Sequence, residues 1–201
     1  MTREQYIVDC YVNKKFSEKQ IASHLFLRPS EVRRVLNQKK VKRRSRSDAI
    51  RHLYITKHGK QPFRETKVLN RQQKILKVTG VMLYWGEGTK KGSSVALANS
   101  DPKMVLVFLK FLREICGVDE KRLRVGLHYY QDHDADKLVT FWSTLTNIPP
   151  HQFDRPFLHA SGKGSYNTKS LYGTVLVRYS DIKLLSLLVS WIEEHQRKML
   201  E

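Results

Sequence analysis

The chain has 201 residues, in which 37 Lys and Arg outnumber 19 Asp and Glu and give a formal net charge of +18. This charge exceeds what solubility requires, so it indicates a polyanionic partner. Nucleic acid fits better than a membrane surface, because the cations do not follow one face of a long amphipathic helix. A basic surface without such a partner remains the alternative. Cys10 and Cys116 lie far apart, which argues against a disulfide framework and a structural zinc site.

Length and charge distribution indicate one small and one medium domain. Residues 1–70 hold 18 cations and 6 acids, whereas residues 71–201 hold 19 and 13. We predict a DNA-binding domain over residues 1–56, a linker over 57–73 and a second domain over 74–201. No apolar run approaches the roughly 18 residues that cross a bilayer, and no secretory segment is recognisable at the N-terminus. We therefore expect a cytoplasmic, nucleoid-associated protein.

Three short helices are predicted in the first 40 residues. Apolar residues at helical spacing define the first, and Ser17 begins the second, with Gln20 completing a capping box. Pro29 suits the first position of the third helix. Its predicted inner face consists of Val32, Val35 and Leu36. Its predicted outer face consists of Ser30, Arg33, Arg34 and Asn37.

This order of helices, over about residues 4–38, resembles the helix-turn-helix of resolvase-like and sigma-factor-like modules. In those modules the last helix lies in the major groove of duplex DNA, which implies DNA contacts for the outer face of the third helix. An unrelated helical hairpin is the alternative. The turn position that usually holds Gly holds Phe26, and Arg28 replaces the usual Ser or Thr cap. A left-handed conformation at Phe costs on the order of 1 kcal/mol, so we expect a locally different turn.

A basic segment directly follows the third helix. Six of its eight residues are cations, namely Lys39, Lys40, Lys42, Arg43, Arg44 and Arg46. Such a run is often a solvated face. Its place behind a candidate recognition helix favours an arm that neutralises phosphates or enters the minor groove.

The second domain begins with a predicted helix over residues 74–88. It is apolar all round from Val78 to Trp85, so we expect it to be buried on every side. Glu87 lies at its C-terminal end, where the helix dipole disfavours negative charge. The carboxylate is therefore expected to face a cation, either a metal ion or the ammonium group of Lys90 or Lys91.

Gly86-Glu87-Gly88 matches the terminal Gly-acid-Gly of the LAGLIDADG motif, and residues 81–85 match its apolar body. The chain thus resembles the LAGLIDADG homing endonucleases. The resemblance implies an α+β fold with one motif copy, a homodimer paired through these helices, and Mg²⁺ held by Glu87 and phosphate oxygens for DNA cleavage. Met82 and Trp85 are bulky where the motif is often small, and Gly80 is expected to relieve crowding between the paired helices.

Further helices alternate with antiparallel-looking strands, which suits one copy of that fold. The predicted elements are a strand over 93–99, a helix over 101–117, a strand over 122–130, a helix over 134–146, extended pieces near 153–159 and 172–179, and a helix from 181. Asp132, Asp134 and Asp136 lack the pattern of a calcium loop, so Asp134 is expected to cap a helix.

The strand over 122–130 alternates apolar with polar residues. In the family such a sheet face lies along the major groove, which implies DNA contacts for Arg122, Arg124 and His128, joined by Lys90, Lys91, Lys163 and Arg178. His128 and His133 could form a metal pair, although ordinary surface or core positions are favoured for both. The primary hypothesis is a sequence-specific duplex DNA endonuclease, and the alternative is a non-catalytic transcriptional regulator with the same domains. Assistance to RNA splicing is less supported, because a helix-turn-helix reads B-form duplex.

Overall fold

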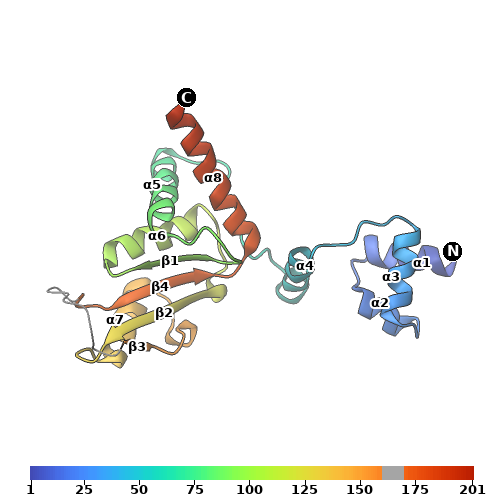
Figure 1. Cartoon of the computed structure of the whole chain (residues 1–201), viewed down its shortest axis with the longest axis horizontal. Helices are drawn as coiled ribbons and strands as arrows, with labels where there is room; N and C mark the ends of the chain where they lie inside the picture. Colours follow the sequence, from blue (N-terminus) through green and yellow to red (C-terminus); the bar gives the residue numbers. More distant parts are fainter. Residues whose placement is uncertain (160–169) are drawn as a thin grey trace. The chain divides into compact units, whose positions relative to one another are not determined.

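The computed structural model describes residues 1–159 and 170–201, and the chain divides into two compact units (Figure 1). Unit 1 is Met1–Lys60 and unit 2 is Gln61–Glu201. The described residues form eight α-helices and one four-stranded sheet. The predicted α+β class is therefore confirmed.

Unit 1 contains the three predicted short helices, α1 (Arg3–Val12), α2 (Glu18–His24) and α3 (Pro29–Gln38). The predicted start of α2 is confirmed, because the Ser17 hydroxyl accepts the Gln20 N–H and the Gln20 carboxamide accepts the Ser17 N–H. One small core joins the three helices, and its buried members are Ile7, Cys10, Tyr11, Ile21, Ala22, Val32 and Leu36.

A fourth helix, α4 (Arg46–His58), was not predicted. Its sequence carries start and stop signals: Ser45 accepts the Asp48 N–H, and Gly59 ends the helix at φ 66°. None of its residues is buried. Helical apolar periodicity is weak here because no face of α4 packs into a core, so the caps were the usable signal.

The expected linker over 57–73 contains three different structures. It begins with the last residues of α4 and ends with the first turn of α5 (Arg71–Glu87). Between them, the Arg64 N–H donates to the Gly117 carbonyl, the Thr66 N–H donates to the Ile115 carbonyl, and Phe63 packs against the core of unit 2. This segment is fixed by backbone hydrogen bonds, which leave no periodic pattern in the side chains.

Unit 2 continues with all the elements that the sequence predicts. After α5 they are β1 (Val95–Asn99), α6 (Pro102–Glu114), β2 (Leu123–Tyr130), α7 (Ala135–Thr146), β3 (Phe157–His159), β4 (Thr174–Tyr179) and α8 (Ile182–Leu200), with 3₁₀ turns at Glu120–Arg122 and Pro150–Gln152. Asp101, Asp134 and Asp181 cap α6, α7 and α8. The predicted capping role of Asp134 is confirmed, and the backbone N–H of Lys137 lowers the pKa of its carboxyl group.

The sheet has the strand order β1-β4-β2-β3. β4 pairs antiparallel with β1 and β2, whereas β2 and β3 are parallel, with His128 opposite Phe157. The expected antiparallel sheet is therefore wrong at this edge, and the sheet is mixed. The chain passes from β2 to β3 through α7 and a 3₁₀ turn, a crossover that brings β3 back in the same direction.

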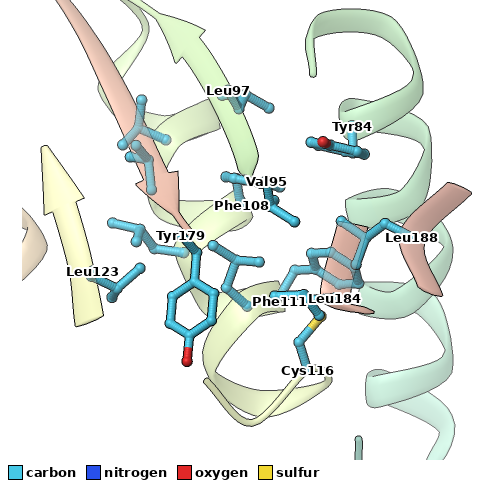
Figure 2. Close-up of a cluster of buried hydrophobic side chains, with 14 of the residues drawn as sticks. Tyr84, Val95, Leu97, Phe108, Phe111, Cys116, Leu123, Tyr179, Leu184 and Leu188 are labelled. Atoms are coloured by element: carbon cyan, nitrogen blue, oxygen red, sulfur yellow. The ribbon is translucent and has the colours of Figure 1, made fainter. Parts of the chain in front are cut away.

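The helices α5, α6 and α8 gather on one side of the sheet (Figure 1). Figure 2 shows the core between them and the strands, including Tyr84, Phe108, Phe111, Tyr179 and Leu188. Both tyrosines are fully buried with their hydroxyls bonded: Tyr84 donates to the Thr89 carbonyl and Tyr179 to the Pro62 carbonyl. Among the described helices, none has the length and apolar character needed to cross a bilayer.

Candidate nucleic-acid interface

The turn between α2 and α3 is left-handed at Phe26, with φ 56°. The Leu27 N–H donates to the Ala22 carbonyl at 2.8 Å, which is the long-range bond of a Schellman motif. The expectation of a different turn is thus wrong. Phe26 tolerates this conformation because its side chain is 97% exposed and meets no neighbour that would add to the backbone strain.

The outer face of α3 is solvent-exposed as predicted, at Ser30, Arg33, Arg34 and Asn37. Arg33 is engaged, since its Nη2 lies 3.2 Å from the Glu18 carboxylate of α2. Within the ranges described, no acidic side chain pairs with Arg34. Ser30, Arg34 and Asn37 therefore form a free polar face on this helix.

The basic segment after α3 is held against unit 1, which differs from the expected arm. Val41 packs against the core and its N–H donates to the Leu36 carbonyl. The Arg44 guanidinium donates to the carbonyls of Lys15 and Phe16 and lies over the Tyr11 ring, 4.4 Å from its centroid. Val41 and Arg44, three positions apart, therefore bind inward.

Acidic residues also hold two further cations of this segment. Arg43 Nε lies 2.7 Å from Glu18 Oε1, and Lys39 Nζ lies 2.6 Å from Glu4 Oε2. Lys40, Lys42 and Arg46 are exposed, and no ion pair joins them to an acid in the described part of the chain. The segment thus presents three free cations rather than the six that the sequence suggested.

Helix α5 is buried on one side only, so the prediction of burial on every side is wrong. Ile75, Val78 and Trp85 are 60%, 43% and 42% exposed. Gly80 lies on the opposite side, where an added Cβ would overlap the Phe111 ring. Gly80 therefore permits close packing of α5 on α6 within the chain, and it does not face a partner helix. Gly86 lies in open space at the exposed side.

Glu87 is the last residue of α5 and is exposed. Lys90 and Lys91 are exposed too, and neither forms an ion pair with Glu87 in the described part of the chain. The expected lysine–carboxylate pair is therefore not formed. The described residues contain no group of three or more Asp, Glu, His or Cys side chains able to hold a metal ion. Glu87 is thus an accessible carboxylate that no ion pair engages within residues 1–159 and 170–201.

The cations predicted on the sheet face are mostly engaged. Arg122 pairs with Asp181 at 3.4 Å, donates to the Ser180 carbonyl and lies over the Tyr179 ring. Arg178 Nη2 lies 2.8 Å from Asp154 Oδ2. Arg124 is exposed, but its Nη1 donates to the carbonyls of Lys121 and Leu123. Lys163 lies outside the described residues.

His128 and His133, for which a metal pair was the less favoured alternative, have different partners in the structure. His128 lies instead against His159 of β3, with Nδ1 and Nε2 3.0 Å apart, while the Nδ1 of His133 faces the backbone N–H of Tyr130. The sequence alone did not single out His159 or the neighbouring Phe157. Their i, i+2 spacing in a short extended segment was the available signal.

Both cysteines are free and buried, as expected for reduced core residues. Burial raises the pKa of Cys116, so this thiol is kept protonated.

Comparisons of the chain with models of protein families, with characterised proteins and with solved structures found no match. The residues and their geometry are thus the basis for a functional proposal.

Proposed function

We propose that the protein binds duplex DNA, with unit 1 acting as a helix-turn-helix and α3 as its recognition helix. The observation that carries the proposal is the tight left-handed turn at Phe26, which connects α2 to a helix with a free polar face. An α-helix fits the major groove of B-form DNA. Arg34 suits the acceptor edge of guanine and Asn37 suits adenine, both through paired hydrogen bonds.

Free cations next to α3 support the same proposal. Lys40, Lys42 and Arg46 follow the recognition helix and are exposed. Contacts of such residues with phosphates position a protein on the duplex without reading its sequence. Affinity for DNA should therefore fall steeply with salt, by a slope of about 0.9 for each phosphate neutralised.

A homodimer through α5 is the second part of the proposal. Ile75, Val78, Met82 and Trp85 recur every three or four residues, which places them on one helix face. Three of these four large apolar side chains are more than two-fifths exposed. Gly86 on that face allows close approach of a second helix. A second copy of α5 would cover this stripe about a two-fold axis, as the resemblance to LAGLIDADG proteins implies.

DNA cleavage is favoured by the place of Glu87 at the end of this exposed stripe. In such a dimer the two Glu87 carboxylates would approach each other at the ends of the paired helices. Each could hold Mg²⁺ together with a phosphate oxygen, and the ion would supply Lewis-acid activation of water for attack on the DNA backbone. Without that approach, the same two units form a non-catalytic regulator.

Duplex binding is tested by selecting targets from a random duplex library with the full chain, and then measuring affinity by fluorescence anisotropy. Arg34→Ala should weaken binding to the selected site about tenfold, because a paired contact with a base contributes about 1–3 kcal/mol. Arg33→Ala is the matched control: it removes the same charge from the same helix, but from a side chain that Glu18 already holds. Equal losses in both variants would contradict base reading by Arg34.

Cleavage is tested by incubating the protein with a plasmid library and Mg²⁺. If it is an endonuclease, the wild type cuts, whereas Glu87→Gln binds the same sites without cutting. If neither cuts although both bind, the regulator is the correct function.

The dimer is tested by Trp85→Glu, which should convert a dimer into monomers in analytical ultracentrifugation. The preference for DNA is tested by competition, in which structured RNA should displace duplex DNA poorly.

A further inference from the structure

Four aromatic side chains form a continuous surface at the β2–β3 edge of the sheet. This ring surface consists of His128, Tyr130, Phe157 and His159. Its strands lie at the end of the strand order, so the surface is at the sheet edge (Figure 1). The parallel register places His128 opposite Phe157 and Tyr130 opposite His159, which puts all four side chains on one face. That face is opposite to the one on which Leu127 is buried in the core.

The rings contact one another as a connected set. The His128 ring centroid lies 5.5 Å from that of Phe157 and 5.2 Å from that of His159. The His159 centroid lies 4.8 Å from that of Phe157 and 5.7 Å from that of Tyr130. The two imidazoles are linked by the 3.0 Å contact between ring nitrogens. These contacts hold the rings in place before any ligand arrives.

The ring surface is open to solvent although it is aromatic. Phe157 is 56% exposed and Tyr130 is 39% exposed. Exposing aromatic rings forgoes the stabilisation that their burial would give, so a purely structural role would place them inward. The unit's core already contains its own aromatic residues, such as Tyr84 and Phe108. The exposed rings are therefore available to a flat, apolar ligand group.

Charge on the same face identifies the kind of ligand. Arg124 of β2 and Arg178 of β4 are direct partners in the antiparallel register, so both lie on the face of the ring surface. Asp154 pairs with Arg178, whereas Arg124 is exposed and pairs with no acid in the described part of the chain. Four residues separate Arg124 from His128, which is about 13 Å along a strand. A ligand with flat rings and a negatively charged backbone matches this arrangement of rings and arginines.

We propose that the ring surface binds unpaired bases of single-stranded nucleic acid. Bases stack on Phe157 and Tyr130, and the backbone runs toward Arg124, the arginine of this face that no acid pairs with in the described residues. Single strands offer free base faces to aromatic side chains, whereas the bases of a duplex are already stacked on each other. This site is separate from α3, so its failure would leave duplex binding by unit 1 intact, and the reverse also holds.

The test measures binding of the full chain to fluorescein-labelled (dT)₂₀, to the same length of oligouridylate, and to a 20-base-pair duplex. Phe157→Ala should weaken single-strand binding about tenfold, because stacking on one aromatic residue contributes to that extent. Phe157→Trp should restore it. Leu158→Ala is the matched control, since Leu158 lies on the same short strand but alternates to the other face. Circular dichroism and thermal melting confirm that each variant is folded.

The expected pattern is a loss of single-strand affinity in Phe157→Ala and Tyr130→Ala, with duplex affinity unchanged. A difference between the (dT)₂₀ and uridylate arms identifies whether DNA or RNA is the natural ligand. Unchanged single-strand affinity in Phe157→Ala overturns the proposal. An equal loss in Leu158→Ala, or an equal loss on the duplex, also overturns it, because stacking on the ring surface would then not explain the binding.

Discussion

The outer face of α3 and the outer face of the sheet were both expected to present cations to DNA, yet they differ. On α3, Glu18 holds Arg33, whereas no acid in the described residues pairs with Arg34. On the sheet, Arg178 is paired and Arg124 donates to backbone carbonyls, while aromatic rings are exposed nearby. A helix projects its outer side chains radially into solvent. On the sheet, Asp154 belongs to a segment that is hydrogen-bonded beside β2 and so reaches Arg178, and Arg124 folds back onto carbonyls at the start of its own strand.

Gly80→Ala should have the largest effect, and it tests the close packing of α5 on α6. An added Cβ overlaps the Phe111 ring, and overpacking of this kind costs about 1–3 kcal/mol. Unfolding of unit 2 in urea should therefore shift to lower denaturant concentration. Gly86→Ala is the control, because its Cβ enters open space. Equal stability of the two variants would show that Gly80 does not contact α6.

Arg44→Ala should have the next largest effect, and it tests whether this cation acts inside unit 1. The variant loses hydrogen bonds to two backbone carbonyls and the contact with Tyr11, so we expect about 1–2 kcal/mol of destabilisation. Lys42→Ala removes a cation of the same segment that is exposed, and its melting temperature should equal that of the wild type. If both variants melt like the wild type, the basic segment is not docked.

Alkaline pH should destabilise unit 2 through its buried tyrosines. Burial raises the pKa of Tyr84 and Tyr179 to about 12, above their ordinary value of 10.0. The unfolded chain ionises these hydroxyls first, so the stability is fully present below pH 10 and is lost as the pH rises toward 12. Ultraviolet titration at 295 nm should show tyrosines that ionise only near pH 12. Titration of every tyrosine near pH 10 would contradict this burial.

Glu18→Gln should have the smallest effect on stability, and it acts in opposite directions on folding and binding. Glu18 holds both Arg33 and Arg43, and these arginines are about half exposed, so the ion pairs contribute only about 0.5 kcal/mol. The substitution frees two cations beside the recognition helix. Affinity for duplex DNA should therefore rise several-fold at low salt and converge with wild type at high salt. A fall in affinity would show that Glu18 positions the arginines productively.

The fold was predictable wherever local signals suffice. Ser17, Asp101, Asp134 and Asp181 mark helix starts because their side chains satisfy free backbone N–H groups at those ends. Strand β2 was predictable from its alternation of buried and exposed residues. Helix α4 also had caps at both ends, but it lacks a buried face and so lacked the apolar pattern that confirms a helix.

The sequence by itself determined the elements, the +18 charge and the candidate residues, because these depend on local periodicity and composition. Tertiary structure decided which cations are free, which side of α5 is exposed, and that β3 brings Phe157 and His159 beside His128. These side chains bind residues that are distant in the sequence: Arg44 donates to the Lys15 carbonyl, and Arg178 pairs with Asp154. Contacts between distant segments depend on how the whole chain packs, which no local pattern encodes.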